Sequence, residues 1–180
     1  NPSYIDKYDI VDDLVDGGTF LLNCPWSDEE LEHRLPGHVK KLIAEHNIQV
    51  YTIDGVEIGR QLGLGNRINT VLQSAFFKLA KIIPEADAIQ YMKDAALKSY
   101  GKKGEKVVQM NYAAIDRGAE AVRKVQVPAS WKDAEDTMPT HTATGSRADL
   151  VDFVNKILIP ANAQRGDKLP VSTFVGREDG

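Results

Sequence analysis

Two short apolar segments separated by a helical segment constrain this chain more than any other feature. Residues 19–23 (TFLLN) lie between glycines and Pro25, which is typical of a buried strand. Residues 48–53 (IQVYTI) alternate and are rich in β-branched side chains, which predicts a second strand. Between them, Ser27-Asp28-Glu29-Glu30 forms a capping box, which predicts a helix start. This order indicates an α/β fold: a three-layer α/β/α domain with a small, mostly parallel or mixed central sheet.

The apolar spacing typical of helices recurs along most of the chain. It predicts helices over these segments: 5–16, 31–43 with a break near Pro36, 56–61, 68–83, 85–100, 105–124 and 150–159. Residues 125–127 (VQV) are predicted to form one more short strand, and the tail from Pro160 onward is expected to be extended.

The chain is predicted to divide into three parts. Residues 1–131 form the α/β core. Residues 132–160 form an acidic linker and the closing helix of the same domain, and residues 161–180 form a tail that leads into the next domain. Both ends look cut, which predicts a fragment of a longer protein.

Composition excludes several classes of protein. The chain has 180 residues, of which 42% are hydrophobic and 27% charged, close to the globular average. Its net charge of -4 does not suggest a partner nucleic acid. The single cysteine, Cys24, excludes an internal disulfide and an iron–sulfur cluster held by this chain alone, and it favours a reducing compartment. No apolar run approaches the roughly 20 residues of a membrane span.

The main candidate site is the glycine-rich entry into the helix predicted at 68–83. Gly63-Leu64-Gly65-Asn66-Arg67-Ile68-Asn69 has only two glycines of a dinucleotide-binding loop, and a helical segment separates it from the preceding strand. Free amide groups at a helix start favour anions, and the Arg67 guanidinium is suited to a phosphate. The alternative is structural: the glycines end one helix and Asn66 caps the next.

Other candidate residues are less specific. Lys40-Lys41 and Lys102-Lys103 are basic pairs that usually lie on solvated surfaces, and the second lacks the ending of a phosphate-binding P-loop. Cys24 has no evident base partner and is interpreted as a packing residue. Trp26 and Trp131 are interpreted as packing residues as well. The sequence therefore lacks a self-contained catalytic set, and we expect no catalytic residue and no metal ligand here.

Six stretches, in order along the chain, resemble the pyruvate:ferredoxin (flavodoxin) oxidoreductases. They are GGTFLLNCPW (17–26), YTID (51–54), GLGNRINTVLQSAFF (63–77), YGKKG (100–104), VPASW (127–131) and GDKLPVS (166–172). The resemblance covers nearly the whole chain and corresponds to the gamma-type third domain of that family.

The resemblance implies that the parent enzyme oxidatively decarboxylates pyruvate, with coenzyme A as acetyl acceptor. It implies thiamine diphosphate and 4Fe–4S clusters on other domains, ferredoxin or flavodoxin as electron partner, and a cytoplasmic homodimer. It further implies that this domain handles coenzyme A, whose phosphates suit Gly65, Asn66, Arg67 and Asn69, together with Lys40 and Lys41.

Two hypotheses follow from the resemblance. In the first, this chain is a coenzyme-A-handling module that is inactive on its own. In the second, it is a packing module between domains with no ligand, which predicts an exposed apolar patch around Trp26 or Trp131.

Overall fold

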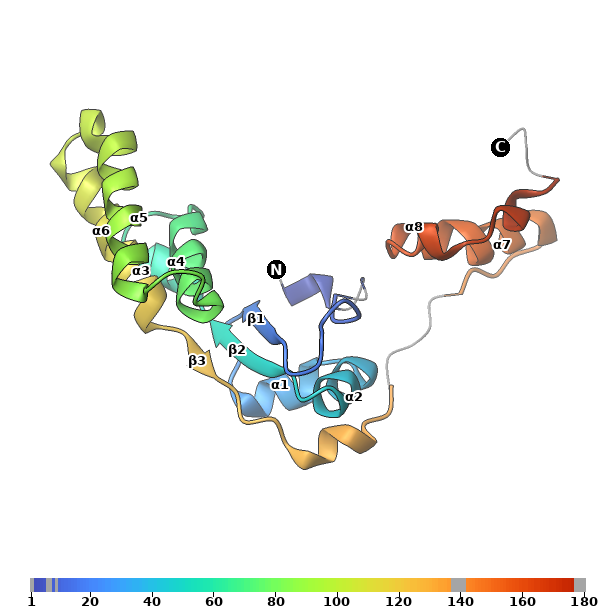
Figure 1. Ribbon diagram of the computed structural model, residues 1–180. Coiled ribbons are helices and arrows are strands. Elements are labelled where there is room, and N and C mark those ends of the chain that lie inside the picture. The colour runs from blue at the N-terminus through green and yellow to red at the C-terminus, as the bar shows by residue number, and fades with distance from the viewer. Residues whose placement is uncertain (1, 6–7, 9, 137–141, 177–180) are drawn as a thin grey trace.

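The computed structural model describes residues 2–5, 8, 10–136 and 142–176, and it confirms the predicted α/β fold (Figure 1). Strands β1 (Thr19–Asn23) and β2 (Gln49–Ile53) pair in parallel, with Leu21 opposite Tyr51. The crossover between them holds α1 (Asp28–Arg34) and α2 (Gly37–Glu45). The capping box is present, and the helix breaks at Pro36 as predicted.

The third strand differs from the prediction. Strand β3 is Arg123–Lys124 and runs antiparallel to β2, which makes the sheet mixed, with the order β1-β2-β3. The strand expected at 125–127 was wrong, although the Val125 N–H still donates to the Val50 carbonyl at 2.9 Å. The pairing uses two exposed basic residues, so an apolar pattern could not reveal it.

Helices cover both faces of the sheet, as alternate strand residues join different cores. Leu22 and Val50 belong to a core with α1, α2 and Trp131. Leu21 and Ile53 contact a second core, which is built from α3 (Gly55–Gln61), α4 (Asn69–Ala80) and α6 (Glu105–Glu120). Helix α5 (Glu85–Tyr100) packs on α6 through a third, smaller core. The three layers position the start of α4 beside the loop between α5 and α6.

The helices end earlier than expected at two places. Helix α4 ends at Ala80, because Lys81 adopts the left-handed conformation with a φ of 49°. Helix α6 ends at Glu120, ahead of β3. The helix predicted over 5–16 is wrong in its described part: residues 10–13 form turns, and Val11 is buried in the first core without a helix. Residues 6, 7 and 9 of that segment lie outside the described residues.

The helix predicted over 150–159 is confirmed, but the chain stays helical beyond it, where an extended tail was expected from Pro160 onward. Helix α7 (Ala148–Phe153), a π-helical turn (Val154–Leu158) and α8 (Ile159–Asn162) form one continuous rod (Figure 1). Pro160 lies in the first turn of α8, directly after the π-helical turn. Two single-turn 3₁₀ helices, Gly166–Lys168 and Val171–Phe174, follow.

Candidate functional site: a cationic pocket at the start of helix α4

The loop before α4 has the backbone geometry that its glycines permit. Gly63 and Gly65 have φ angles of 72° and 59°, in the left-handed region that glycine tolerates. The helix cap is Ile68, which gives no side-chain hydrogen bond, and the first turn has no acidic residue. The structural alternative is confirmed in one part, because Gly63 directly follows the last residues of α3, and wrong in the other, because Asn66 does not cap α4. The first N–H groups of α4 lack a side-chain acceptor, which favours an anion there.

A cavity of about 250 Å³ lies beside this helix start. Arg67, Asn69 and Thr70 line one wall, and Tyr100 and Lys103 line another, with Leu64, Val107, Met110 and Asn111 completing the cavity. Arg67 Nε donates only a long 3.4 Å hydrogen bond to the Leu64 carbonyl. The Lys103 ammonium lies 5.4 Å from the centre of the Tyr100 ring. In the part of the chain that the structure describes, neither cation forms an ion pair with a carboxylate.

The structure brings together two of the six predicted site residues, Arg67 and Asn69. Gly65 and Asn66 lie in the same loop but do not line the cavity. Lys103 completes the positive charge, although its sequence context predicts only a solvated basic pair. The sequence signal for Lys103 was the basic loop at residues 101–104, between two long helices. Only the packing of α5 and α6 against α4 places that loop beside Arg67.

Lys40 and Lys41 lie on α2 and do not line this cavity. Lys40 Nζ donates to the Glu32 carbonyl at 2.9 Å and to Glu32 Oε1 at 3.2 Å. The indole N–H of Trp131 also donates to Glu32, and these interactions lower the pKa of that carboxyl. Lys40 therefore has a structural partner, whereas Lys41 faces Glu45 at 3.9 Å on the helix surface.

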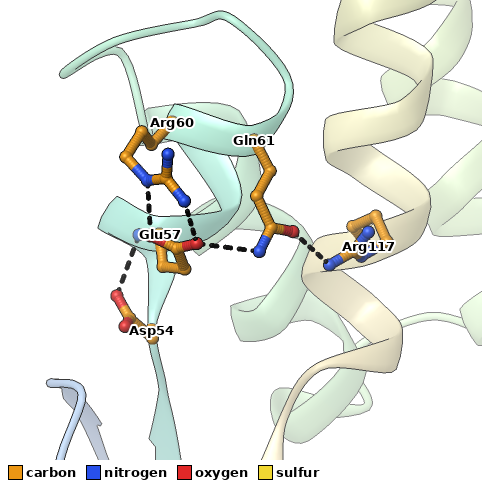
Figure 2. Close-up of polar contacts among 5 residues, drawn as sticks. All are labelled: Asp54, Glu57, Arg60, Gln61 and Arg117. Carbon is orange, nitrogen blue, oxygen red and sulfur yellow. Dashed lines mark hydrogen bonds and ion pairs between the residues drawn. The ribbon is translucent and has the colours of Figure 1, made fainter.

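A second polar cluster lies at the carboxyl end of β2 (Figure 2). The Asp54 side chain accepts the Glu57 N–H at 2.9 Å, and Glu57 accepts two hydrogen bonds from Arg60 at 2.6 and 2.7 Å. Hydrogen bonds from Arg60 and then Gln61 lower the pKa of Glu57 to about 2. Gln61 in turn accepts from Arg117 at 3.0 Å, which links α3 to α6. Glu57 is thus ionised at neutral pH, which suits a structural link and not proton transfer.

Cys24 and Trp131 are packing residues, as interpreted from the sequence. Burial raises the pKa of the Cys24 thiol, which keeps it protonated and unreactive. A 4Fe–4S cluster takes four thiolates, so the cysteine content of this chain does not fit such a cluster. The second hypothesis placed an exposed apolar patch around Trp26 or Trp131, but Trp131 is only 1% exposed and Trp26 is partly buried against the first core.

The fold and the cavity define an α/β module with a preformed cationic pocket. Comparison of the sequence with known proteins shows the family to which it belongs. The family model described as pyruvate ferredoxin/flavodoxin oxidoreductase matches residues 1–121. The chain belongs to this family. A second model, described as a domain of unknown function and called EKR, matches residues 135–180.

Individual relatives agree over nearly the whole chain. It is 47% identical to a pyruvate:ferredoxin oxidoreductase of Moorella thermoacetica and 49% identical to a pyruvate-flavodoxin oxidoreductase of Klebsiella pneumoniae. It is 39% identical to an NADP(+) pyruvate dehydrogenase of Cryptosporidium parvum. These matches cover 97%, 99% and 97% of this chain but only 14%, 15% and 10% of the relatives. Among the described residues, no helix has the length and apolar character needed to cross a membrane.

Proposed function

We propose that this chain is the gamma-type third domain of a pyruvate:ferredoxin or flavodoxin oxidoreductase and that it handles coenzyme A. The complete enzyme converts pyruvate and coenzyme A to acetyl-CoA and CO2, and it passes the electrons to ferredoxin or flavodoxin. Thiamine diphosphate and the 4Fe–4S clusters belong to other domains of a cytoplasmic homodimer. The chain alone is inactive.

The names of the relatives support a role in pyruvate chemistry and not in acceptor choice. One name gives ferredoxin, another flavodoxin and a third NADP(+), whereas all three give pyruvate. A segment that is similar in all three enzymes is best explained by a step that they share. In the reaction proposed here, transfer of the acetyl group to coenzyme A is a step that does not depend on the electron acceptor.

The observation that carries the proposal is the cavity between Arg67 and Lys103. Coenzyme A has a pyrophosphate and a 3′-phosphate, and both need cationic partners. The Arg67 guanidinium provides a planar fork of donors, Lys103 a point charge, and the first turn of α4 its free N–H groups. Since Arg67 and Lys103 have no ion-paired carboxylate in the described part of the chain, no ion pair has to break for a phosphate to bind.

The test is the KM for coenzyme A of the complete enzyme. We expect Arg67→Ala and Lys103→Ala each to raise this KM by about tenfold, the value of one charge-assisted hydrogen bond, without changing the KM for pyruvate. Arg147→Ala is the matched control, because Arg147 is a surface arginine paired with Asp149. An unchanged KM for coenzyme A in both pocket variants would overturn this site.

Lys40 and Lys41 remain a separate prediction on α2. Lys41→Ala tests it, because Lys41 is exposed and its removal leaves the Glu32 interactions of Lys40 intact. A higher KM for coenzyme A in Lys41→Ala alone would place the phosphates at α2. A higher KM in both sets of variants would indicate that the ligand extends between the two regions.

A second candidate is a packing module without a ligand. Exposed apolar side chains support it, among them Ile82 and Tyr91, which are 66% and 64% exposed, whereas Trp131 is buried. This function predicts that all the charge variants keep the KM for coenzyme A. It also predicts that calorimetry of the complete enzyme gives the same coenzyme A affinity for the pocket variants as for the unchanged enzyme.

A further inference from the structure

Asn111 is a buried polar residue in the middle of helix α6. Only 6% of its surface is exposed, and it lines the cavity beside the start of α4. Asparagine is a weak helix former, and a buried carboxamide costs free energy unless its polar atoms are hydrogen-bonded. An apolar residue at this position would stabilise α6 better, so the carboxamide points to a role beyond stability.

The hydrogen bonds of the Asn111 side chain are incomplete. Its Nδ2 donates to the Val107 carbonyl at 2.8 Å, one turn earlier in α6, which orients the carboxamide. A carboxamide has a second N–H donor and an acceptor oxygen. Among the described residues, no group donates to Asn111 Oδ1. Every fully enclosed polar side-chain atom of these residues has a partner, so Oδ1 is not enclosed and opens on the cavity that Asn111 lines.

The cavity combines this carboxamide with apolar walls and positive charge. Leu64, Val107 and Met110 supply apolar surface, and Arg67 and Lys103 line the same cavity. A ligand that fits these groups has an apolar ring with a hydrogen-bond donor beside an acceptor, and it carries phosphate close to that ring. Adenine in a nucleotide is such a ring, because its amino group adjoins ring nitrogens and asparagine pairs with both at once.

We propose that Asn111 recognises the adenine base of coenzyme A, with Oδ1 accepting from the amino group and the second N–H donating to a ring nitrogen. This inference rests on the proposed function and names the part of coenzyme A that the cavity holds. The ribose that carries the base also carries the 3′-phosphate and the pyrophosphate, which matches a base cavity beside Arg67 and Lys103. The thiol end has to leave this domain, because in the proposed function thiamine diphosphate belongs to another domain.

The test is the competition of two nucleotides with coenzyme A in the complete enzyme. Adenosine 3′,5′-bisphosphate and inosine 3′,5′-bisphosphate have the same phosphates, but inosine replaces the amino donor by an oxygen acceptor that would face Oδ1. We expect the inhibition constant of the inosine nucleotide to be about tenfold higher. Asn111→Leu should abolish this preference, because leucine forms neither hydrogen bond. Gln109→Leu is the matched control and should keep the preference, because Gln109 is an exposed carboxamide on α6 that bonds to Glu105 and does not line the cavity.

Three results would overturn the proposal: no preference for adenosine in the unchanged enzyme, a preserved preference in Asn111→Leu, or weaker inhibition by 4′-phosphopantetheine alone in that variant. Asn111→Ser is the second variant if leucine disturbs the packing of α6. Its hydroxyl can donate or accept, so it should show no preference either. Failure of the proposed function is distinguishable, because Arg67→Ala would then leave the KM for coenzyme A unchanged. If only the adenine assignment fails, Arg67→Ala still raises that KM.

Discussion

Two regions of the chain are stabilised in different ways: the contact between helices α4 and α6, and the C-terminal unit, which is residues 142–176. At the crossing, Gly118 lets the helices approach closely, and the buried Ser74 hydroxyl donates to the Ile115 carbonyl at 2.5 Å. In the C-terminal unit, the Asn155 carboxamide holds the backbone of Ala143 with bonds of 2.7 and 3.1 Å. One region has a close-packed core, and the other has polar contacts around a single buried side chain. Hydrogen bonds define a local shape in both, but only the first buries enough apolar surface to stabilise it.

The largest expected difference comes from the same substitution in both regions. Ile115 is fully buried in the helical body, so Ile115→Ala should lower the free energy of unfolding by about 2–5 kcal/mol. Ile157→Ala should change the main transition by only about 0.5 kcal/mol, because we expect the C-terminal unit to open separately. Urea denaturation of the chain measures both. An equal loss in the two variants would mean that the unit unfolds together with the body.

A smaller difference is expected for two glycines. An alanine Cβ at Gly118 would lie 2.4 Å from the Val71 carbonyl oxygen, whereas one at Gly145 would meet nothing closer than 3.6 Å. Because the atom met by Gly118→Ala is backbone, its crowding cost of about 1–3 kcal/mol should exceed the roughly 0.5–1 kcal/mol that alanine gains in a helix. Gly145→Ala should be nearly neutral in thermal unfolding. A stabilised Gly118→Ala would show that the crossing can widen at little cost.

The smallest expected effect on the free energy of unfolding concerns the start of helix α2. Helix α2 begins after Pro36, which offers no side-chain cap, and Asp136 supplies one by accepting the His38 N–H at 3.2 Å. Burial raises the pKa of Asp136, but the hydrogen bonds from the backbone and side chain of His38 outweigh it and hold the pKa below its usual 3.8. Asp136→Ala should lower the free energy of unfolding by about 1 kcal/mol at neutral pH.

The pH dependence gives this prediction its sign. Because the folded state lowers the pKa of Asp136, its contribution is present above the usual value of 3.8 and is lost as the pH falls through the lower folded value. The free energies of unfolding of the unchanged chain and of Asp136→Ala should therefore converge once the pH has fallen below the lowered pKa of Asp136 in the folded state. A difference that stays constant to lower pH would contradict an ionised cap.

The secondary structure of residues 19–53 was predictable, because its sequence signals are local. Pro36 breaks the helix wherever it lies, and the Ser27–Glu30 capping box closes within one turn. The candidate site was predictable only in part. Arg67 precedes helix α4, Asn69 begins it, and the glycines before them mark the loop. Lys103 could not be assigned, because its position beside Arg67 depends on how α5 and α6 pack.

The sequence by itself determined the two strands and the helical crossover between them, since each depends on residue types close together along the chain, and it determined the family through six stretches spread along the chain. Tertiary structure alone decided the rest. Arg123–Lys124 became a strand because β2 had a free edge, and Lys40 became a structural residue because Glu32 lies beside it. These outcomes depend on groups far apart in the sequence or on different elements, and local propensity does not specify such contacts.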